Sequence, residues 1–155
     1  MSQVLPHSLL SDFDISLFLH GKHSRLYEKL GAFEIIQDGV KGTFFAVWAP
    51  NALSVHVLGN FNVWDKESHT LFPRWDSSGI WEGFIPHVHT GETYKFGIKT
   101  KTGEYLEKLD PFGLYCETPP KTASIVWNTY KEWKDQAWMK DRPTYNSLQS
   151  PMSIY

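Results

Sequence analysis

The chain has 155 residues, of which 41% are hydrophobic and 21% charged, so it can bury one core of ordinary globular composition. Its formal net charge is -2 and no basic block stands out, which argues against nucleic-acid and anionic-membrane partners. No apolar run approaches ~18 residues and no signal-peptide pattern opens the chain. A single cysteine, Cys116, cannot form an internal disulfide, so we expect a reducing, cytoplasmic setting.

Residues 1–31 are predicted to form a helical lead-in. Over residues 11–20, Ser11 can cap a helix, Asp14 lies near its positive N-terminus, and Gly21 follows as a stop signal. A second short helix is predicted over residues 24–30.

From residue 32 the hydrophobic period changes from helical to two, which predicts strands. The predicted strands cover residues 33–37, 42–48, 54–58, 81–85, 93–99 and 123–127. Asp38-Gly39 is a hairpin signal between the first two. In the strand over 93–99, Lys95 lies on the face opposite the apolar residues.

This number and spacing of strands predicts an all-β fold, an immunoglobulin-like β-sandwich over residues 32–127. The short N-terminal helices precede it. The polar, proline-interrupted segment 128–155 is predicted to be an irregular C-terminal arm.

The residues themselves give little support for a catalytic site. Glycoside chemistry needs two facing carboxylates, and the candidates stand in ordinary turn or strand contexts: Asp65, Glu67, Glu82, Glu92 and Asp110. His87 and His89 fall in a predicted loop, so we interpret them as solvated side chains and not as metal ligands. We expect no catalytic residue, no metal and no cofactor.

The aromatic content of 15% is the informative number. Sugar rings pack their flat C–H faces on aromatic planes, while their hydroxyls form hydrogen bonds with polar side chains. The candidate carbohydrate-binding residues are Trp64 in a polar loop, Lys95 on an outward strand face and Tyr105 after a tight turn. A loop tryptophan is also often part of a core, so both interpretations of Trp64 stay open.

Several motifs occur in the order and spacing of family 48 carbohydrate-binding modules. Residues 45–52 (FAVWAPNA) and 55–64 (VHVLGNFNVW) resemble the family signature. The following blocks are similar at residues 79–86 (GIWEGFIP), 94–96 (YKF), 108–112 (KLDPF) and 122–126 (TASIV). Residues 26–32 (LYEKLGA) and 151–155 (PMSIY) resemble the flanks of this module in glycogen branching enzymes, where the second flank opens a (β/α)₈ barrel.

The resemblance implies a module that binds α-1,4-glucan or glycogen ahead of the barrel of a 1,4-α-glucan branching enzyme, a glycosyltransferase of glycogen biosynthesis. The family's catalytic residues lie in the barrel, so a chain ending at Tyr155 would be non-catalytic. The barrel would be its intramolecular partner, and residues 128–155 its linker and first segment. By the same resemblance, Trp64 matches a stacking tryptophan and Lys95 a hydroxyl-binding lysine. Tyr105 takes the place of a second stacking aromatic, which is usually tryptophan.

Two other functions remain open. The domain could be a structural spacer that stabilises and positions the barrel, with Phe44, on the face opposite Phe45 and Val47, packing between the two. It could also be the equivalent module of a debranching enzyme or of an energy-sensing kinase partner.

Overall fold

The structure is a computed structural model and describes residues 3–145 and 147–153. Its helical elements are α1 (Asp12–Leu19), η1 (Leu26–Glu28), η2 (Asn60–Asn62) and α2 (Gln136–Tyr145). Its strands are β1 (Gly31–Gln37), β2 (Val40–Trp48), β3 (Ala52–Gly59), β4 (Phe72–Pro73), β5 (Ile80–Pro86), β6 (Thr93–Thr100), β7 (Tyr105–Lys108), β8 (Tyr115–Cys116) and β9 (Ser124–Ile125).

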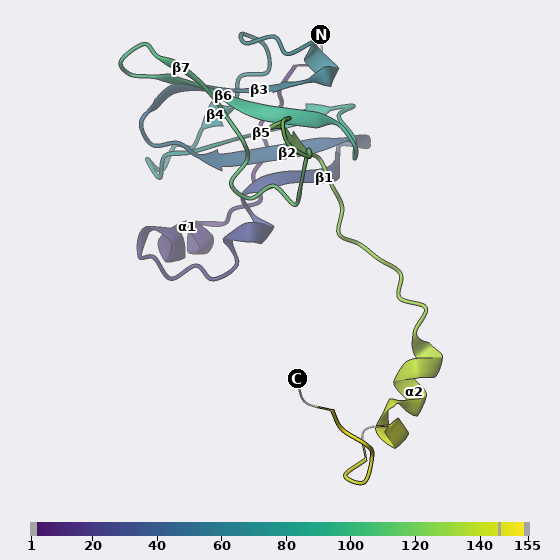
Figure 1. Cartoon of the computed structure of the whole chain (residues 1–155). Helices are drawn as coiled ribbons and strands as arrows, with labels where there is room; N and C mark the ends of the chain where they lie inside the picture. The colour runs from purple at the N-terminus through teal and green to yellow at the C-terminus, as the bar shows by residue number, and fades with distance from the viewer. Residues whose placement is uncertain (1–2, 146, 154–155) are drawn as a thin grey trace.

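Two antiparallel sheets form the sandwich (Figure 1). One has the order β1-β2-β5-β4; the other has the order β3-β6-β9-β8, with β7 also paired to β6. The predicted hairpin between β1 and β2 is confirmed, because Gln37 pairs with Val40 across Asp38 and Gly39. Both turn residues have positive φ, at 50° and 79°, as the tight hairpin turns that match the strand twist require.

The main core lies between the sheets. Phe45 and Val47 of β2 face Tyr94 and Phe96 of β6, and all four side chains are buried. The rings of Phe45 and Tyr94 meet edge to face with centroids 5.1 Å apart. The predicted alternation of β2 and β6 is therefore confirmed, and the predicted immunoglobulin-like sandwich is the observed fold.

A second core lies outside the sandwich, between the lead-in and the outer face of β2. Leu10, Ile15 and Leu30 cover Phe44, which is 0% exposed. A capping box holds the start of α1, with Ser11 N 2.8 Å from an Asp14 carboxylate oxygen and Asp14 N 3.2 Å from Ser11 Oγ. The interface role expected for Phe44 is wrong, because the chain's own lead-in already buries it.

Other elements differ from the sequence prediction in extent. The predicted helix over 24–30 is only the 3₁₀ turn η1, and β4, β7 and β8 were not predicted. The arm, expected to be irregular, leads away from the sandwich in Figure 1 and contains the helix α2.

Residues 151–153 have no strand structure, and the end of the barrel-like motif, Ile154 and Tyr155, lies outside the described residues. No helix in the described part of the chain is long and apolar enough to cross a membrane.

Candidate functional site

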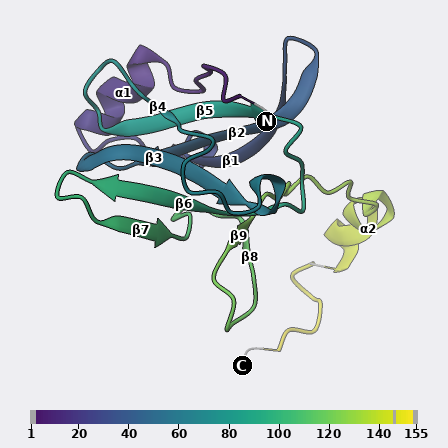
Figure 2. The same ribbon diagram turned by 90° about the horizontal axis from the view of Figure 1, so that it is seen from above.

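The outer face of β3, β6 and β7 lies on the side of the molecule away from α1 (Figure 2). Tyr105 of β7 pairs with Lys99 of β6, and its ring reaches across the strand to Gly97. A Cβ at Gly97 would lie 2.0 Å from the Tyr105 hydroxyl oxygen, so only glycine leaves room for the ring. The hydroxyl is buried and has no hydrogen-bond partner among the described residues. Burial raises the pKa of Tyr105 to about 12, and the neighbouring negative charge of Glu107 adds to this.

A charged cluster surrounds the Tyr105 ring. Lys66 Nζ lies over the ring, 4.9 Å from its centroid, and 2.9 Å from Glu107 Oε1. Lys95 Nζ lies 4.0 Å from Glu107 Oε2. The hydrogen bond from Lys66 lowers the pKa of Glu107, so this carboxylate stays charged between the two lysines at neutral pH. The structure thus brings Lys95 and Tyr105 together, and it adds Lys66 and Glu107, which the sequence did not single out.

Trp64 belongs to the loop that leaves the end of β3. Its backbone φ is 59°, a left-handed conformation, and its N–H bonds to Gly59 O at 2.9 Å. The indole nitrogen donates to Asn60 Oδ1 at 3.0 Å, and the side chain is half-buried. Gly59 pairs with Tyr94, the residue next to Lys95, so the Trp64 loop begins beside Lys95.

Asn62 holds this loop in shape. Its side-chain oxygen accepts from Gly59 N at 2.9 Å, and its amide nitrogen donates to Val57 O at 2.8 Å. Beyond the loop, the chain returns along the free edge of β3, where Val57 N donates to His69 O and Leu71 N to Val55 O. Because both ends of the loop are bound to β3, the loop would lose little conformational entropy when a ligand binds.

A cleft of about 490 Å³ runs beside the Tyr105 ring. It is lined mainly by polar groups: Ser54, His56, Lys66, Glu67, Lys99, Gly103 and Tyr105. The His56 ring nitrogen lies 2.9 Å from Ser54 Oγ, which fixes the imidazole on the β3 side. An aromatic plane bordered by hydrogen-bonding groups can accept a sugar ring on the plane and its hydroxyls at the border.

The buried carboxylates lie elsewhere and have structural partners. Glu82 of β5 bonds to Arg74 at 2.7 Å and to Ser8 at 2.9 Å. Asp110 accepts the hydroxyl of Tyr94 and the N–H of Phe112. Burial raises the pKa of both carboxyls. Glu82 lies on β5, whereas Asp110 follows β7 and is bound to Tyr94 of β6, so each carboxyl has its own structural partners.

The two loop histidines are exposed, and His87 occupies a turn with φ of 63°. Within residues 3–145 and 147–153, no group of three histidine, cysteine or acidic side chains could hold a metal ion. Cys116, on β8, is a free and exposed thiol.

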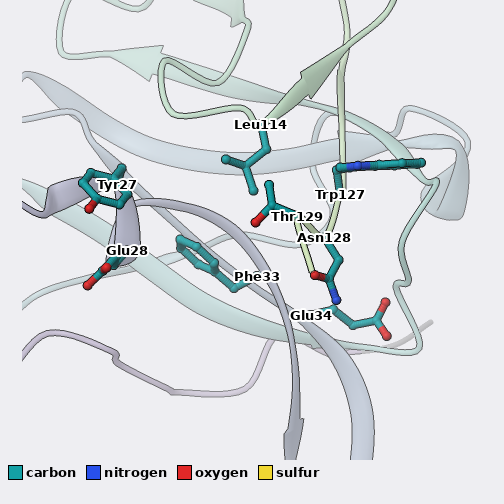
Figure 3. Close-up of a pocket in the computed structure, with 8 residues that line it drawn as sticks. All are labelled: Tyr27, Glu28, Phe33, Glu34, Leu114, Trp127, Asn128 and Thr129. Atoms are coloured by element: carbon teal, nitrogen blue, oxygen red, sulfur yellow. The ribbon is translucent and has the colours of Figure 1, made fainter. Parts of the chain in front are cut away.

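A second hollow, of about 460 Å³, lies where the chain leaves the sandwich (Figure 3). Tyr27, Leu114 and Trp127 line it and are 55%, 46% and 44% exposed. Phe33, from β1, contributes to its lining, and Figure 3 shows Tyr27 and Trp127 on opposite sides of Leu114. We call this hollow the exit groove. Its half-exposed apolar side chains make it an apolar surface without a partner in the described chain.

A family model of carbohydrate-binding module 48 (isoamylase N-terminal domain) matches residues 29–113. The 1,4-alpha-glucan branching enzyme GlgB of Thermosynechococcus vestitus is 51% identical over 148 residues, which is 94% of this chain and 19% of that protein. The enzyme of the same name from Aromatoleum aromaticum is 48% identical over 100% of this chain and 24% of its own length. The chain therefore spans about a fifth to a quarter of the length of these relatives.

Among solved structures, a pullulanase complexed with maltotetraose from Anoxybacillus sp. LM18-11 has the same fold. It superposes with a TM-score of 0.52 over 81% of this chain and 16% of that one, at 17% identity. At this level of identity the likeness extends to the fold alone.

Proposed function

The chain belongs to the carbohydrate-binding module 48 family, and on that premise we propose that it binds α-1,4-glucan such as glycogen. The observation that carries the proposal is the meeting of Tyr105, Lys95 and the Trp64 loop on one uncovered sheet face. The opposite sheet presents no such face, because the lead-in covers its β2 strand. The three predicted site residues keep their expected roles in this proposal.

Each group contributes one part of glucan recognition. The flat faces of Trp64 and Tyr105 would pack against the C–H faces of glucose units, which displaces water from both surfaces. Lys95 has no acceptor role and can only donate, so it would bind sugar hydroxyl oxygens. Asn62 touches no sugar in this scheme, but it fixes the loop that presents Trp64.

We further propose that the module serves a 1,4-α-glucan branching enzyme of glycogen biosynthesis in the cytoplasm and is itself non-catalytic. Identities of 51% and 48% with two such enzymes, over nearly the whole chain, support this origin. The debranching alternative has weaker support, since the pullulanase is only 17% identical. The single cysteine is consistent with a reducing compartment.

Affinity electrophoresis tests the binding function. The 155-residue chain should be retarded in a gel containing glycogen, and soluble maltoheptaose should restore its mobility. A gel containing dextran, whose backbone linkages are α-1,6, is the matched polymer control and should retard the chain less. A folded chain whose mobility is the same in the glycogen gel, in the glycogen gel with maltoheptaose and in the dextran gel would show that the proposal is wrong.

A structural role beside a catalytic barrel is the second candidate function, and the exit groove favours it. The groove lies where residues 127–129 lead into the arm, so a following domain would lie within reach of its exposed aromatic rings. In a full-length branching enzyme carrying this module, Trp127→Ser should lower the thermal midpoint of the whole enzyme. The same change in the 155-residue chain should have a smaller effect, and equal effects in both would remove the support for a docking role.

A further inference from the structure

We propose that Lys66 competes with a bound glucose unit for the outer face of the Tyr105 ring, and that it thereby sets the affinity of the surface for glucan. The inference rests on the proposed function and concerns Lys66, to which neither the family match nor the site resemblance assigns a role. Its basis is the position of the Lys66 ammonium group over the ring on which a sugar would stack.

The Tyr105 ring has one face available to a ligand. On its inner side the ring lies over β6, because the hydroxyl group occupies the space above Gly97. On its outer side the Lys66 ammonium lies 4.9 Å from the centroid. A sugar stacking on the outer side therefore needs the space that Lys66 occupies.

The contact is weak enough to be displaced. The Lys66 side chain is 58% exposed and its partner Glu107 is 36% exposed, so water screens their ion pair. Moving the ammonium off the ring gives up an exposed cation–π contact and leaves the ion pair free to re-form in another rotamer. Lys66 should therefore reduce glucan affinity without abolishing binding.

Lys95 differs from Lys66 in this respect. Its side chain is only 20% exposed, and its ammonium lies 4.0 Å from Glu107 Oε2. No cation–π contact places it over Tyr105. Lys95 can thus donate to a sugar hydroxyl while Lys66 moves away, so the two lysines have opposite effects on affinity.

Titration calorimetry with maltoheptaose separates these effects. Lys66→Ala should bind about two- to fivefold more tightly than the unchanged chain, because the ligand no longer has to displace an exposed cation–π contact. Lys66→Arg, which can still cover the ring, should bind like the unchanged chain. Lys101→Ala, on the exposed β6–β7 turn, is the control for loss of one positive charge. Unchanged or weaker binding by Lys66→Ala would overturn the inference.

Salt provides a second measurement. Maltoheptaose is neutral, so its own contacts respond little to ionic strength, whereas the cover over Tyr105 is electrostatic. Raising sodium chloride from about 0.05 M to about 0.5 M should tighten binding to the unchanged chain and leave Lys66→Ala unaffected. Equal responses of the two proteins would contradict the inference.

Proton NMR observes the displacement directly. In the free chain, the Lys66 ε-methylene protons should be shifted upfield by the Tyr105 ring current, and Tyr105→Leu should remove that shift. Saturation with maltoheptaose should also remove it. Binding that leaves the upfield shift intact would refute the inference while sparing the proposed function. A chain that binds no maltoheptaose at all would refute both.

Discussion

The outer faces of the two sheets differ in what covers them. On the sheet of β1, β2 and β5, the lead-in completely covers Phe44. On the sheet of β3, β6 and β7, no other layer covers Lys95 and Tyr105. Each face carries an aromatic ring: Phe44 in the middle of β2 and Tyr105 at the start of β7. One ring lies under apolar side chains, and the other lies under a single ammonium group.

The difference shows that an aromatic side chain facing away from the sandwich core is either buried by apolar neighbours or left partly exposed, depending on what covers it. Apolar cover over Phe44 removes water permanently and contributes to folding. A charged and exposed cover over Tyr105 contributes little to folding, because water screens it. Mutations on the two faces should therefore separate unfolding from binding.

The largest expected effect is on the covered face. Phe44→Ala should lower the free energy of unfolding by about 3–5 kcal/mol, because it deletes a fully buried ring and leaves a cavity. Urea unfolding followed by circular dichroism measures this, with Phe13→Ala as control because that ring is 71% exposed on α1. Glucan affinity of the folded fraction should not change. A matching loss of affinity would mean that the two faces are not independent.

The open face should give the opposite result. Trp64→Ala should weaken glycogen or maltoheptaose binding by about 1–3 kcal/mol, the scale of losing an aromatic anchor, and leave most of the unfolding free energy intact. Trp75→Ala is the matched control, because this tryptophan is 82% exposed on the turn after β4 of the other sheet. If Trp64→Ala instead unfolds the chain, the indole ring is part of the core and not a sugar platform.

Acid should weaken one contact of the sheet that contains β1 and β2. Glu34 of β1 binds Lys41 and both polar groups of Thr90, and these contacts lower its pKa from 4.5 to about 2. Its stabilisation is thus present above about pH 4.5 and is lost as the pH falls toward about 2, to the extent of about 1 kcal/mol after allowance for solvent screening.

Glu34→Gln should accordingly destabilise the chain at pH 7 and lose less stability on acidification. Urea midpoints measured between pH 7 and pH 3 report this, with Asp38→Asn on the exposed hairpin turn as control. If the urea midpoints of Glu34→Gln and of the unchanged chain fall in parallel as the pH is lowered, the acid sensitivity does not come from Glu34.

The smallest effect should come from Lys95→Ala. Loss of one hydrogen bond to a sugar should weaken binding by about 0.5–1.5 kcal/mol. Calorimetry measures it, and Lys108→Ala is the control because strand alternation places this residue on the side of β7 opposite Glu107. Tighter binding by Lys95→Ala would show that it resembles Lys66 in covering the ring.

The sequence predicted those strands whose apolar residues alternate over several positions, such as β2 and β6. It could not predict β4 and β8, because two residues are too short to show a period. It also missed α2, because Pro143 and the polar composition of the arm indicated a break. Phe44 was misassigned because alternation gives the face of a strand, and a distant segment decides whether that face is covered.

The candidate site residues stay predictions. Their loop, strand-face and turn contexts pointed to Trp64, Lys95 and Tyr105, and the family resemblance matched them; the structure places Lys95 and Tyr105 in one cluster through Glu107. Lys66 and Glu107 looked like ordinary surface charges, since only the pairing of β6 with β7 and the path of the loop bring them together. One signal was available: Glu107 follows Tyr105 by two positions and so shares its strand face.

The return of residues 68–71 along β3 also affects how molecules meet one another. Without that segment, an eight-residue strand would offer its unpaired backbone groups to a strand of another molecule. The hydrogen bonds that Val57 N donates to His69 O and Leu71 N donates to Val55 O occupy part of this edge. The segment that follows the Trp64 loop therefore also protects this strand edge from pairing with another molecule, and changes that loosen it should favour self-association.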